Sequence, residues 1–142
     1  MAEIAEDKII KVAVSGASGR MGKAIISQII SNPYFRLVAA FDRSNSSLVG
    51  SDATAFIGKT SGIMIASEFS KPLTSTPDVL IDFTLPVSTI NLLEFCENYK
   101  IPAVIGTTGF SKEEKRKITN FAEKYGAVFS PNMSPGVNIT CK

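Results

Sequence analysis

Along the chain, short apolar runs typical of strands alternate with segments in which apolar residues recur at helical spacing. The pattern therefore predicts strands and helices in turn. A β-branched run over residues 8–15 ends at a glycine, and helical periodicity follows over residues 19–30. Pro33 ends that helix, because proline disfavours the α conformation in the preceding residue. An almost wholly apolar strand then covers residues 35–41. A strand that is apolar on both faces is typical of a parallel sheet covered by helices.

The middle of the chain begins with a polar connection and then resumes the alternation. Residues 42–61 are rich in serine, threonine and glycine, which predicts a long loop with a short helix near residues 53–57. Short strands are predicted at residues 63–65 and 79–83. Thr84 is expected to be the N-cap of a helix that has Pro86 in its first turn and continues to about Tyr99.

The last third repeats the pattern. A strand is predicted at residues 102–106, and Ser111 and Glu114 have the spacing of a capping box that opens a helix. Gly126 ends this helix, and residues 127–130 form a sixth strand. The alternation predicts an α/β fold over residues 1–134: a Rossmann-like, doubly wound parallel sheet of about six strands in a three-layer αβα arrangement.

Composition limits the classes of function. The 142 residues are 44% hydrophobic and 20% charged, as expected of one globular domain. The net charge is only +2 and no run of like charge is longer than residues 115–117, so the sequence gives no sign of nucleic-acid binding. The apolar runs are strand-sized and the first residues are acidic, so we expect no membrane segment or signal peptide, and a cytoplasmic protein. With no histidine and two distant cysteines, no metal site is expected.

The segment that carries chemistry is the glycine loop Gly16-Ala17-Ser18-Gly19-Arg20-Met21-Gly22. It lies between a predicted strand and a predicted helix, where free helix amides and the helix dipole favour an anion. Gly16 permits the tight turn, Gly19 the approach of the backbone to the anion, and Gly22 the close packing of the helix. The loop is therefore predicted to hold the pyrophosphate of NADH or NADPH. Ser18 replaces the usual second glycine, and a glycine-rich turn without a ligand is the alternative.

The second strand end predicts the adenosine side of the site. Asp42 follows Gly22 by twenty residues, about the distance at which an acidic residue meets the ribose hydroxyls in this fold. Arg43 follows at once, and its guanidinium suits the extra phosphate of NADP. The pair indicates that both cofactors are accepted. A solvated ion pair at a strand end is the alternative.

Three further strand ends should meet at the same edge of the sheet. They are Asp82-Phe83-Thr84, Gly106-Thr107-Thr108-Gly109 and Ser130-Pro131-Asn132-Met133. Their hydroxyls and small residues suit the nicotinamide end of a cofactor. Each also has an ordinary explanation of about equal weight: turn glycines, helix caps, a turn-forming asparagine and a methionine in the core.

Together these segments resemble one known family, the 4-hydroxy-tetrahydrodipicolinate reductases (dihydrodipicolinate reductases) of the bacterial and plant lysine pathway. The resemblance covers the chain from Lys8 onwards. Four segments carry it: residues 12–22, Val79-Leu80-Ile81-Asp82-Phe83-Thr84, Val104-Ile105-Gly106-Thr107-Thr108-Gly109-Phe110 and Asn132-Met133-Ser134-Pro135-Gly136-Val137-Asn138. Four motifs in the same order are far more specific than one glycine loop.

The resemblance implies an NAD(P)H-dependent oxidoreductase of diaminopimelate biosynthesis that reduces a small cyclic dicarboxylate. It places Asp42 at the ribose and Arg43 at the NADP phosphate, and it implies that Thr108 also touches the substrate. The residues implied to bind NADPH or NADH are Gly16, Ala17, Ser18, Gly19, Arg20, Met21, Asp42, Arg43, Phe83, Thr84, Gly106, Thr107, Thr108, Ser130, Pro131, Asn132 and Met133.

The resemblance also implies a second half. The family continues into a C-terminal domain that binds substrate, forms the homotetramer and carries a histidine-rich motif with a lysine, so residues 135–142 are expected to begin the connection to a domain absent from this chain. No catalytic residue is expected here, and the chain alone is expected to be inactive. A truncated form, a proteolytic remnant and a shortened gene are the alternatives for its length, and the residues do not separate them. A free-standing NAD(P)-binding regulatory or redox-sensing module is the alternative function.

Overall fold

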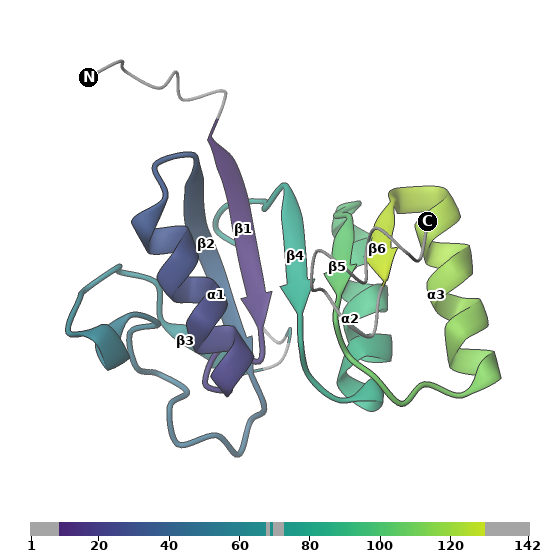
Figure 1. Cartoon of the computed structure of the whole chain (residues 1–142), viewed down its shortest axis with the longest axis horizontal. Coiled ribbons are helices and arrows are strands. Elements are labelled where there is room, and N and C mark those ends of the chain that lie inside the picture. The colour runs from purple at the N-terminus through teal and green to yellow at the C-terminus, as the bar shows by residue number, and fades with distance from the viewer. Residues whose placement is uncertain (1–8, 68, 70–72, 130–142) are drawn as a thin grey trace, which may run out of the picture.

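A six-stranded parallel sheet forms the centre of the molecule (Figure 1), with the strand order β3-β2-β1-β4-β5-β6. The computed structural model describes residues 9–67, 69 and 73–129. The strands are β1 (Ile10–Ser15), β2 (Phe35–Asp42), β3 (Ile65–Ser67), β4 (Val79–Asp82), β5 (Ala103–Ile105) and β6 (Ala127–Phe129). The helices are α1 (Arg20–Ser31), α2 (Pro86–Tyr99) and α3 (Lys112–Tyr125). This confirms the predicted α/β class and the number of strands.

Alternate residues of the buried strands pack on opposite faces of the sheet. Val12 and Val14 of β1 lie in one apolar cluster with Ile26 of α1. Ala13 lies in the other cluster with Leu92 of α2 and, further along, Phe121 of α3. The helices therefore cover both faces, which confirms the three layers and explains why the strands are largely apolar on both faces.

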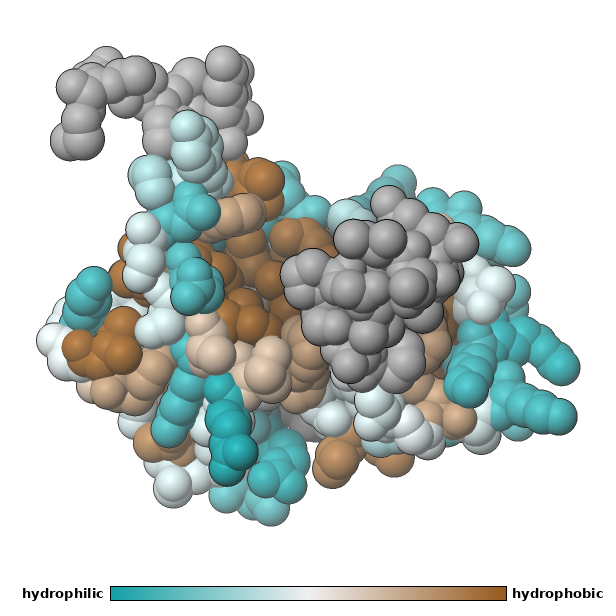
Figure 2. Space-filling model, viewed as in Figure 1, coloured by the Kyte–Doolittle hydropathy of each residue, from teal (hydrophilic) through white to brown (hydrophobic). Residues whose placement is uncertain are grey.

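The face that carries α1 is only partly covered within the described ranges. Beside α1, an apolar groove of about 710 Å³ runs over β1 and β4. Met21, Phe35 and Ile10 line it and keep 46%, 37% and 40% of their surface exposed. Figure 2 shows hydrophobic residues gathered on this face. The two faces are thus unequal: α2 and α3 bury their side more completely than α1 buries its own.

Two boundaries differ from the sequence prediction. The third strand is Ile65–Ser67 rather than residues 63–65, because Met64 forms an antiparallel bridge with Asp52 and only the later residues pair with β2. Thr84 is not the N-cap of α2. That position belongs to Leu85, with no side-chain cap, while the Thr84 hydroxyl donates to Asp82 instead.

Other local predictions are confirmed. Ser111 and Glu114 form the reciprocal capping box of α3, and Gly126 ends this helix with a φ of +87°, which favours glycine. Pro86 stands in the first turn of α2. The short helix in the long connection is a 3-10 helix at Ala55–Ile57.

Asp52 organises the connection between β2 and β3. Its carboxylate accepts the main-chain N–H of Thr54 at 2.9 Å and of Gly62 at 2.8 Å, and the Ser61 hydroxyl at 2.8 Å. These hydrogen bonds, that to the Thr54 N–H foremost, hold the pKa of Asp52 below its usual range. The connection is therefore folded around one carboxylate.

Among the described residues, no helix is long and apolar enough to span a bilayer.

Candidate functional site

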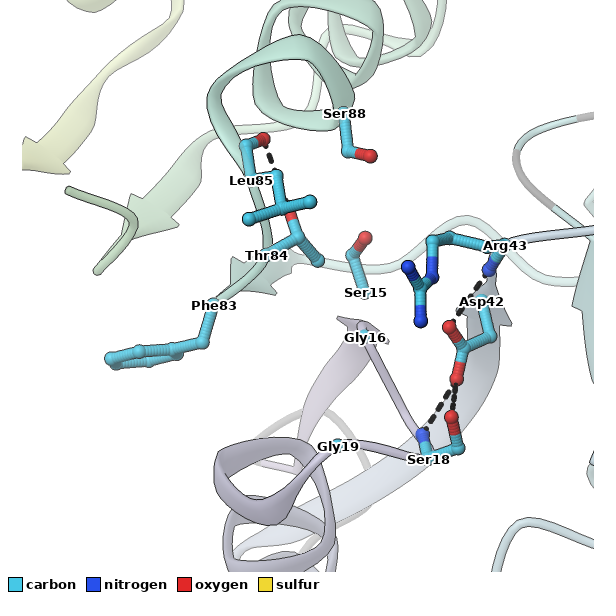
Figure 3. Close-up of a pocket in the computed structure, with 10 residues that line it drawn as sticks. All are labelled: Ser15, Gly16, Ser18, Gly19, Asp42, Arg43, Phe83, Thr84, Leu85 and Ser88. Atoms are coloured by element: carbon cyan, nitrogen blue, oxygen red, sulfur yellow. Dashed lines mark hydrogen bonds between the residues drawn. The ribbon is translucent and has the colours of Figure 1, made fainter. Parts of the chain in front are cut away.

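A cavity opens at the carboxyl ends of β1, β2 and β4. The chain leaves β1 for β2 on one side and later places β4 on the other side, so this is the switch point where open α/β sheets bind ligands. The cavity has a volume of about 290 Å³. Its lining consists of Ser15, Gly16, Ser18, Gly19, Asp42, Arg43, Phe83, Thr84, Leu85 and Ser88 (Figure 3).

The glycine loop forms the first wall. Gly16 has a φ of +82°, a conformation that glycine adopts without strain, and the main-chain N–H groups of Gly16 and Ala17 donate to the carbonyl of Phe41 at 2.9 and 3.0 Å. Gly19 is the N-cap of α1 and offers no side-chain cap to the first turn, which also contains no acidic residue. The N-terminus of α1 is thus open to an anion.

Gly22 fixes how closely α1 approaches this loop. A Cβ atom at Gly22 would collide with the carbonyl oxygen of Gly16, which is main chain and has no rotamer to adopt. The predicted role of Gly22 in close helix packing is therefore supported by the geometry, with the loop itself as the surface it packs against.

Asp42 and Arg43 form the second wall. Asp42 is 6% exposed. It accepts the main-chain N–H of Ser18 at 2.8 Å and of Arg43 at 2.7 Å, and a short hydrogen bond from the Ser18 hydroxyl. The Ser46 hydroxyl lies 3.3 Å from that of Ser18. In Figure 3 the Arg43 side chain extends from the end of β2 into the space between Asp42 and Gly16. One acidic and one basic group thus face the same opening.

The loop after β4 and the start of α2 form the third wall, and the loop after β5 lies behind it. Gly106 donates its N–H to the carbonyl of Asp82 at 2.8 Å, and the ring of Phe83 lies where a Cβ of Gly106 would be. Thr107 is buried and its hydroxyl accepts the N–H of Thr84 at 2.9 Å, whereas Thr108 is exposed. The two loops are therefore tied together behind the cavity.

Of the thirteen predicted site residues that the structure describes, it brings seven together in the cavity lining. Gly16, Ser18, Gly19, Asp42, Arg43, Phe83 and Thr84 line the cavity. Ala17 is buried in the core beside α1, Arg20 is exposed, and Met21 lines the apolar groove instead. Gly106, Thr107 and Thr108 lie next to the cavity wall without lining it. Ser130, Pro131, Asn132 and Met133 fall outside the described residues.

Sequence reasoning missed three lining residues, Ser15, Leu85 and Ser88. Ser15 is the last residue of β1, and the other two lie at the start of α2. A signal was available for Ser15, because it immediately precedes the glycine loop. Leu85 and Ser88 depend on where α2 begins, and Thr84 was assigned as the N-cap. Within the described ranges, no three potential metal ligands of the His, Cys, Asp or Glu type gather in one place.

The sheet order, the glycine loop at the switch point and the acid at the end of β2 define a dinucleotide-binding Rossmann domain. Comparison with known proteins identifies the family to which this domain belongs. The family model "Dihydrodipicolinate reductase, N-terminus" matches residues 10–133, and the chain belongs to this family.

Curated relatives carry the corresponding name. The chain is 47% identical over 133 residues to a 4-hydroxy-tetrahydrodipicolinate reductase of Janthinobacterium sp. (strain Marseille), covering 94% of this chain and 49% of the relative. It is 44% identical to one from Ralstonia nicotianae, with 94% and 50% covered. The chain thus spans about half the length of the curated relatives it matches.

Solved structures agree on the fold. A dipicolinate-bound dihydrodipicolinate reductase from Paenisporosarcina sp. TG-14 superposes with a TM-score of 0.67 at 26% identity, over 92% of this chain and 50% of that one. A myo-inositol dehydrogenase from Corynebacterium glutamicum superposes with a TM-score of 0.64 at 20% identity, over 93% and 39%. At that identity the second likeness shows the fold alone.

Proposed function

We propose that this chain is the cofactor-binding part of a reductase that converts 4-hydroxy-tetrahydrodipicolinate to tetrahydrodipicolinate with NADPH or NADH. One observation carries the proposal: in a chain of this family, the uncapped start of α1 opens into the same cavity as Asp42 and Arg43. A nicotinamide cofactor supplies the hydride. The residues of this chain would bind and orient it.

The glycine loop suits the pyrophosphate. The first-turn N–H groups of α1 have no side-chain partner at the N-cap, and the helix has twelve residues whose dipoles add to a positive N-terminal end. Gly19 has an ordinary φ of −75°, so the backbone does not require glycine there. Its lack of a side chain is better explained by the approach of a ligand than by the turn.

Asp42 and Arg43 suit the adenosine ribose with and without its phosphate. The Asp42 carboxylate would accept hydrogen bonds from the ribose hydroxyls of NADH, and the Arg43 guanidinium would pair with the 2′-phosphate of NADPH. Because Arg43 is exposed at the cavity edge, it can turn towards or away from a phosphate without disturbing the core. This supports use of both cofactors.

The nicotinamide end would lie by the loops after β4 and β5. Phe83 and Thr84 line the cavity there, and the exposed Thr108 is available to a ligand, whereas the buried Thr107 acts from behind. We place the remaining contacts, at Ser130 to Met133, by the family resemblance. Thr108 would also meet the substrate.

The activity of the whole protein needs more than this part. The relatives extend over about twice the matched length, and we assign the groups that bind the cyclic dicarboxylate and deliver the proton to that other half, with no catalytic residue in this chain. A homotetramer in the cytoplasm and inactivity of residues 1–142 alone belong to the same proposal.

Titration of the chain with NADPH and NADH, followed by nicotinamide fluorescence, tests cofactor binding. We expect a saturable change with each cofactor. Absence of binding at millimolar cofactor would contradict the proposal. Mixing the chain with a separately produced second half of a relative, and assaying oxidation of NADPH with substrate, tests the reductase activity.

Arg43→Ala provides the sharper form of this experiment. Loss of a charged hydrogen bond to the 2′-phosphate should weaken NADPH by about 1.5–3 kcal/mol, and NADH much less. Arg36→Ala is the matched control, because Arg36 lies near the start of β2, at the opposite end from Arg43. Equal losses of NADPH and NADH in Arg43→Ala would contradict the assignment of this residue.

A further inference from the structure

Asp82, the last residue of β4, lies beneath the cavity and has no exposed surface. Its carboxylate accepts the Thr84 hydroxyl at 2.6 Å, the Thr107 hydroxyl at 2.9 Å and a short hydrogen bond from the Thr89 hydroxyl. The Ser15 side chain is a further hydrogen-bond partner. These hydroxyls come from the end of β1, the loop after β4, helix α2 and the loop after β5, so a single carboxylate joins four separate segments.

The partners are also joined to one another. The Thr107 hydroxyl lies 3.0 Å from the Thr89 hydroxyl and accepts the N–H of Thr84 at 2.9 Å. The main chain adds the hydrogen bond from Gly106 N–H to the Asp82 carbonyl. A fully satisfied polar network in a low-dielectric interior rigidifies what it connects. Here it connects the two loops that border the β4 and β5 side of the cavity.

Stability does not explain this arrangement well. The partners that the structure records for the Asp82 side chain are all hydroxyls, and burial raises the pKa of this carboxyl above its usual range despite their hydrogen bonds. Burying an ionisable group without a cation costs free energy that an apolar residue of similar size would not. A site that tolerates this cost is expected where precise placement of neighbouring groups matters.

We propose that Asp82 is a positioning residue for the nicotinamide half of the cofactor. It does not line the cavity, but two of its partners, Ser15 and Thr84, do, and a third, Thr107, holds the loop that carries Thr108. The adenosine half depends on other groups: the glycine loop, Asp42 and Arg43. This inference rests on the proposed cofactor binding, and it predicts that the two halves of the cofactor respond separately to changes at Asp82.

The test compares binding of NADH with binding of ADP, which lacks the nicotinamide and its ribose. The variants are Asp82→Asn and Thr89→Val. Thr89 is buried, does not line the cavity and loses only its hydroxyl in valine. We expect each variant to weaken NADH about ten-fold, by nicotinamide fluorescence, and to change the affinity for ADP, by calorimetry, less than about two-fold.

Thr54→Val is the matched control. Thr54 is equally buried and its hydroxyl also donates to a carboxylate, that of Asp52 at 2.8 Å, away from the cavity lining. It should lower the melting temperature as Thr89→Val does and leave the ratio of NADH to ADP affinity unchanged. If Asp82→Asn fails to fold, Thr89→Val decides the matter.

The outcomes separate the two proposals. Equal losses of NADH and ADP, or unchanged NADH affinity in Thr89→Val, would overturn the positioning role of Asp82 while leaving cofactor binding intact. If the unaltered chain binds neither NADH nor NADPH, the proposed function fails, and the positioning role fails with it. Selective loss of NADH in Thr89→Val, with Thr54→Val unaffected, supports both.

Discussion

Asp42 and Asp82 each end a parallel strand, but their carboxylates have different surroundings. Asp42 lines the cavity and accepts two main-chain N–H groups and the hydroxyl of Ser18. Asp82 lies below the cavity and is surrounded by hydroxyls from four segments. Position in the fold therefore does not decide what a strand-end carboxylate does. Its neighbours decide whether it faces a ligand or joins the loops that do.

The same contrast separates the two sides of the cavity. The side formed by β1 and β2 is shaped by main chain: a Cβ at Gly22 would collide with the main chain of Gly16, so no side chain fits between the loop and α1. The side formed by β4 and β5 is shaped by side chains, with the Phe83 ring against Gly106 and threonine hydroxyls behind it. We expect the first side to be intolerant of added atoms and the second to accept them at Gly106, where only the Phe83 ring has to move and the Asp82 network does not.

Gly22→Ala and Gly106→Ala test this expectation most directly. Alanine favours a helix over glycine by about 1 kcal/mol, but at Gly22 its Cβ would collide with a main-chain carbonyl, so we expect a net destabilisation of about 3 kcal/mol. At Gly106 the Phe83 ring can turn aside, and we expect about 1 kcal/mol. Urea unfolding of both variants measures the difference. Similar losses would mean that the two sides are equally rigid.

Gly19→Ala separates folding from binding on the glycine-loop side. Gly19 has a φ of −75°, and a Cβ there would lie 3.3 Å from the carbonyl oxygen of Gly16, so a small shift accommodates it. We expect a change in stability below about 1 kcal/mol. Affinity for NADPH and NADH should fall more than about ten-fold, since the methyl group would stand at the start of α1 where the pyrophosphate approaches. If Gly19→Ala retained its affinity for NADPH and NADH, the absence of a side chain at Gly19 would have no role in cofactor binding.

Most of the fold could be predicted from the sequence, because the signals for its helices and strands lie in residues close together along the chain. The glycine loop, the capping box of Ser111 and Glu114, and the largely apolar strands are each recognisable from neighbouring residues. The third strand was displaced by two residues because the bridge between Met64 and Asp52 joins positions twelve apart. Nothing in the local pattern of residues 63–65 indicates that bridge.

The site was less predictable because its decisive contacts are long-range. Thr84 has the residue type of an N-cap, yet its hydroxyl donates to Asp82 and its N–H to Thr107, which is 23 positions away. Ser18 was noted as a departure from the glycine fingerprint, but its bond to Asp42 joins residues 24 apart. Only the folded sheet places these groups together, so a motif identifies the strand ends without identifying which side chains reach the cavity.

Ser18→Ala sharpens the comparison on the Asp42 side, with a smaller expected effect. The main-chain hydrogen bond from Ser18 to Asp42 remains, so the fold should lose only about 1 kcal/mol. Both bonds from Ser18 go to the same Asp42 oxygen, so removing the hydroxyl leaves that oxygen able to accept one more hydrogen bond, from the ribose, and NADH should bind roughly three-fold more tightly. Ser46→Ala is the control, because it removes a neighbouring hydroxyl that contacts the Ser18 hydroxyl and leaves the bonds from Ser18 to Asp42 in place. Weaker NADH binding in Ser18→Ala would mean that the serine itself contacts the cofactor.

The smallest expected effect is a slope of stability with pH on the Asp82 side. Desolvation raises the pKa of Asp82 in the folded chain, so the folded state holds this proton more tightly than the unfolded state. Its favourable contribution is complete below the ordinary carboxyl pKa, near 4, and is lost as the pH rises through the raised value. Cys96, whose pKa burial and Asp82 raise to about 12, stays neutral throughout this interval.

Asp82→Asn removes that titration and supplies the reference. Urea unfolding of both proteins between pH 4 and 7.5 should show the wild type losing free energy of unfolding relative to the variant as the pH rises. Asp52, whose pKa is lowered, is unchanged in the variant, so its contribution cancels in the difference. Parallel curves would show that the hydroxyls fully compensate the burial of Asp82, which would make its surroundings as favourable to a charged carboxylate as those of an exposed one.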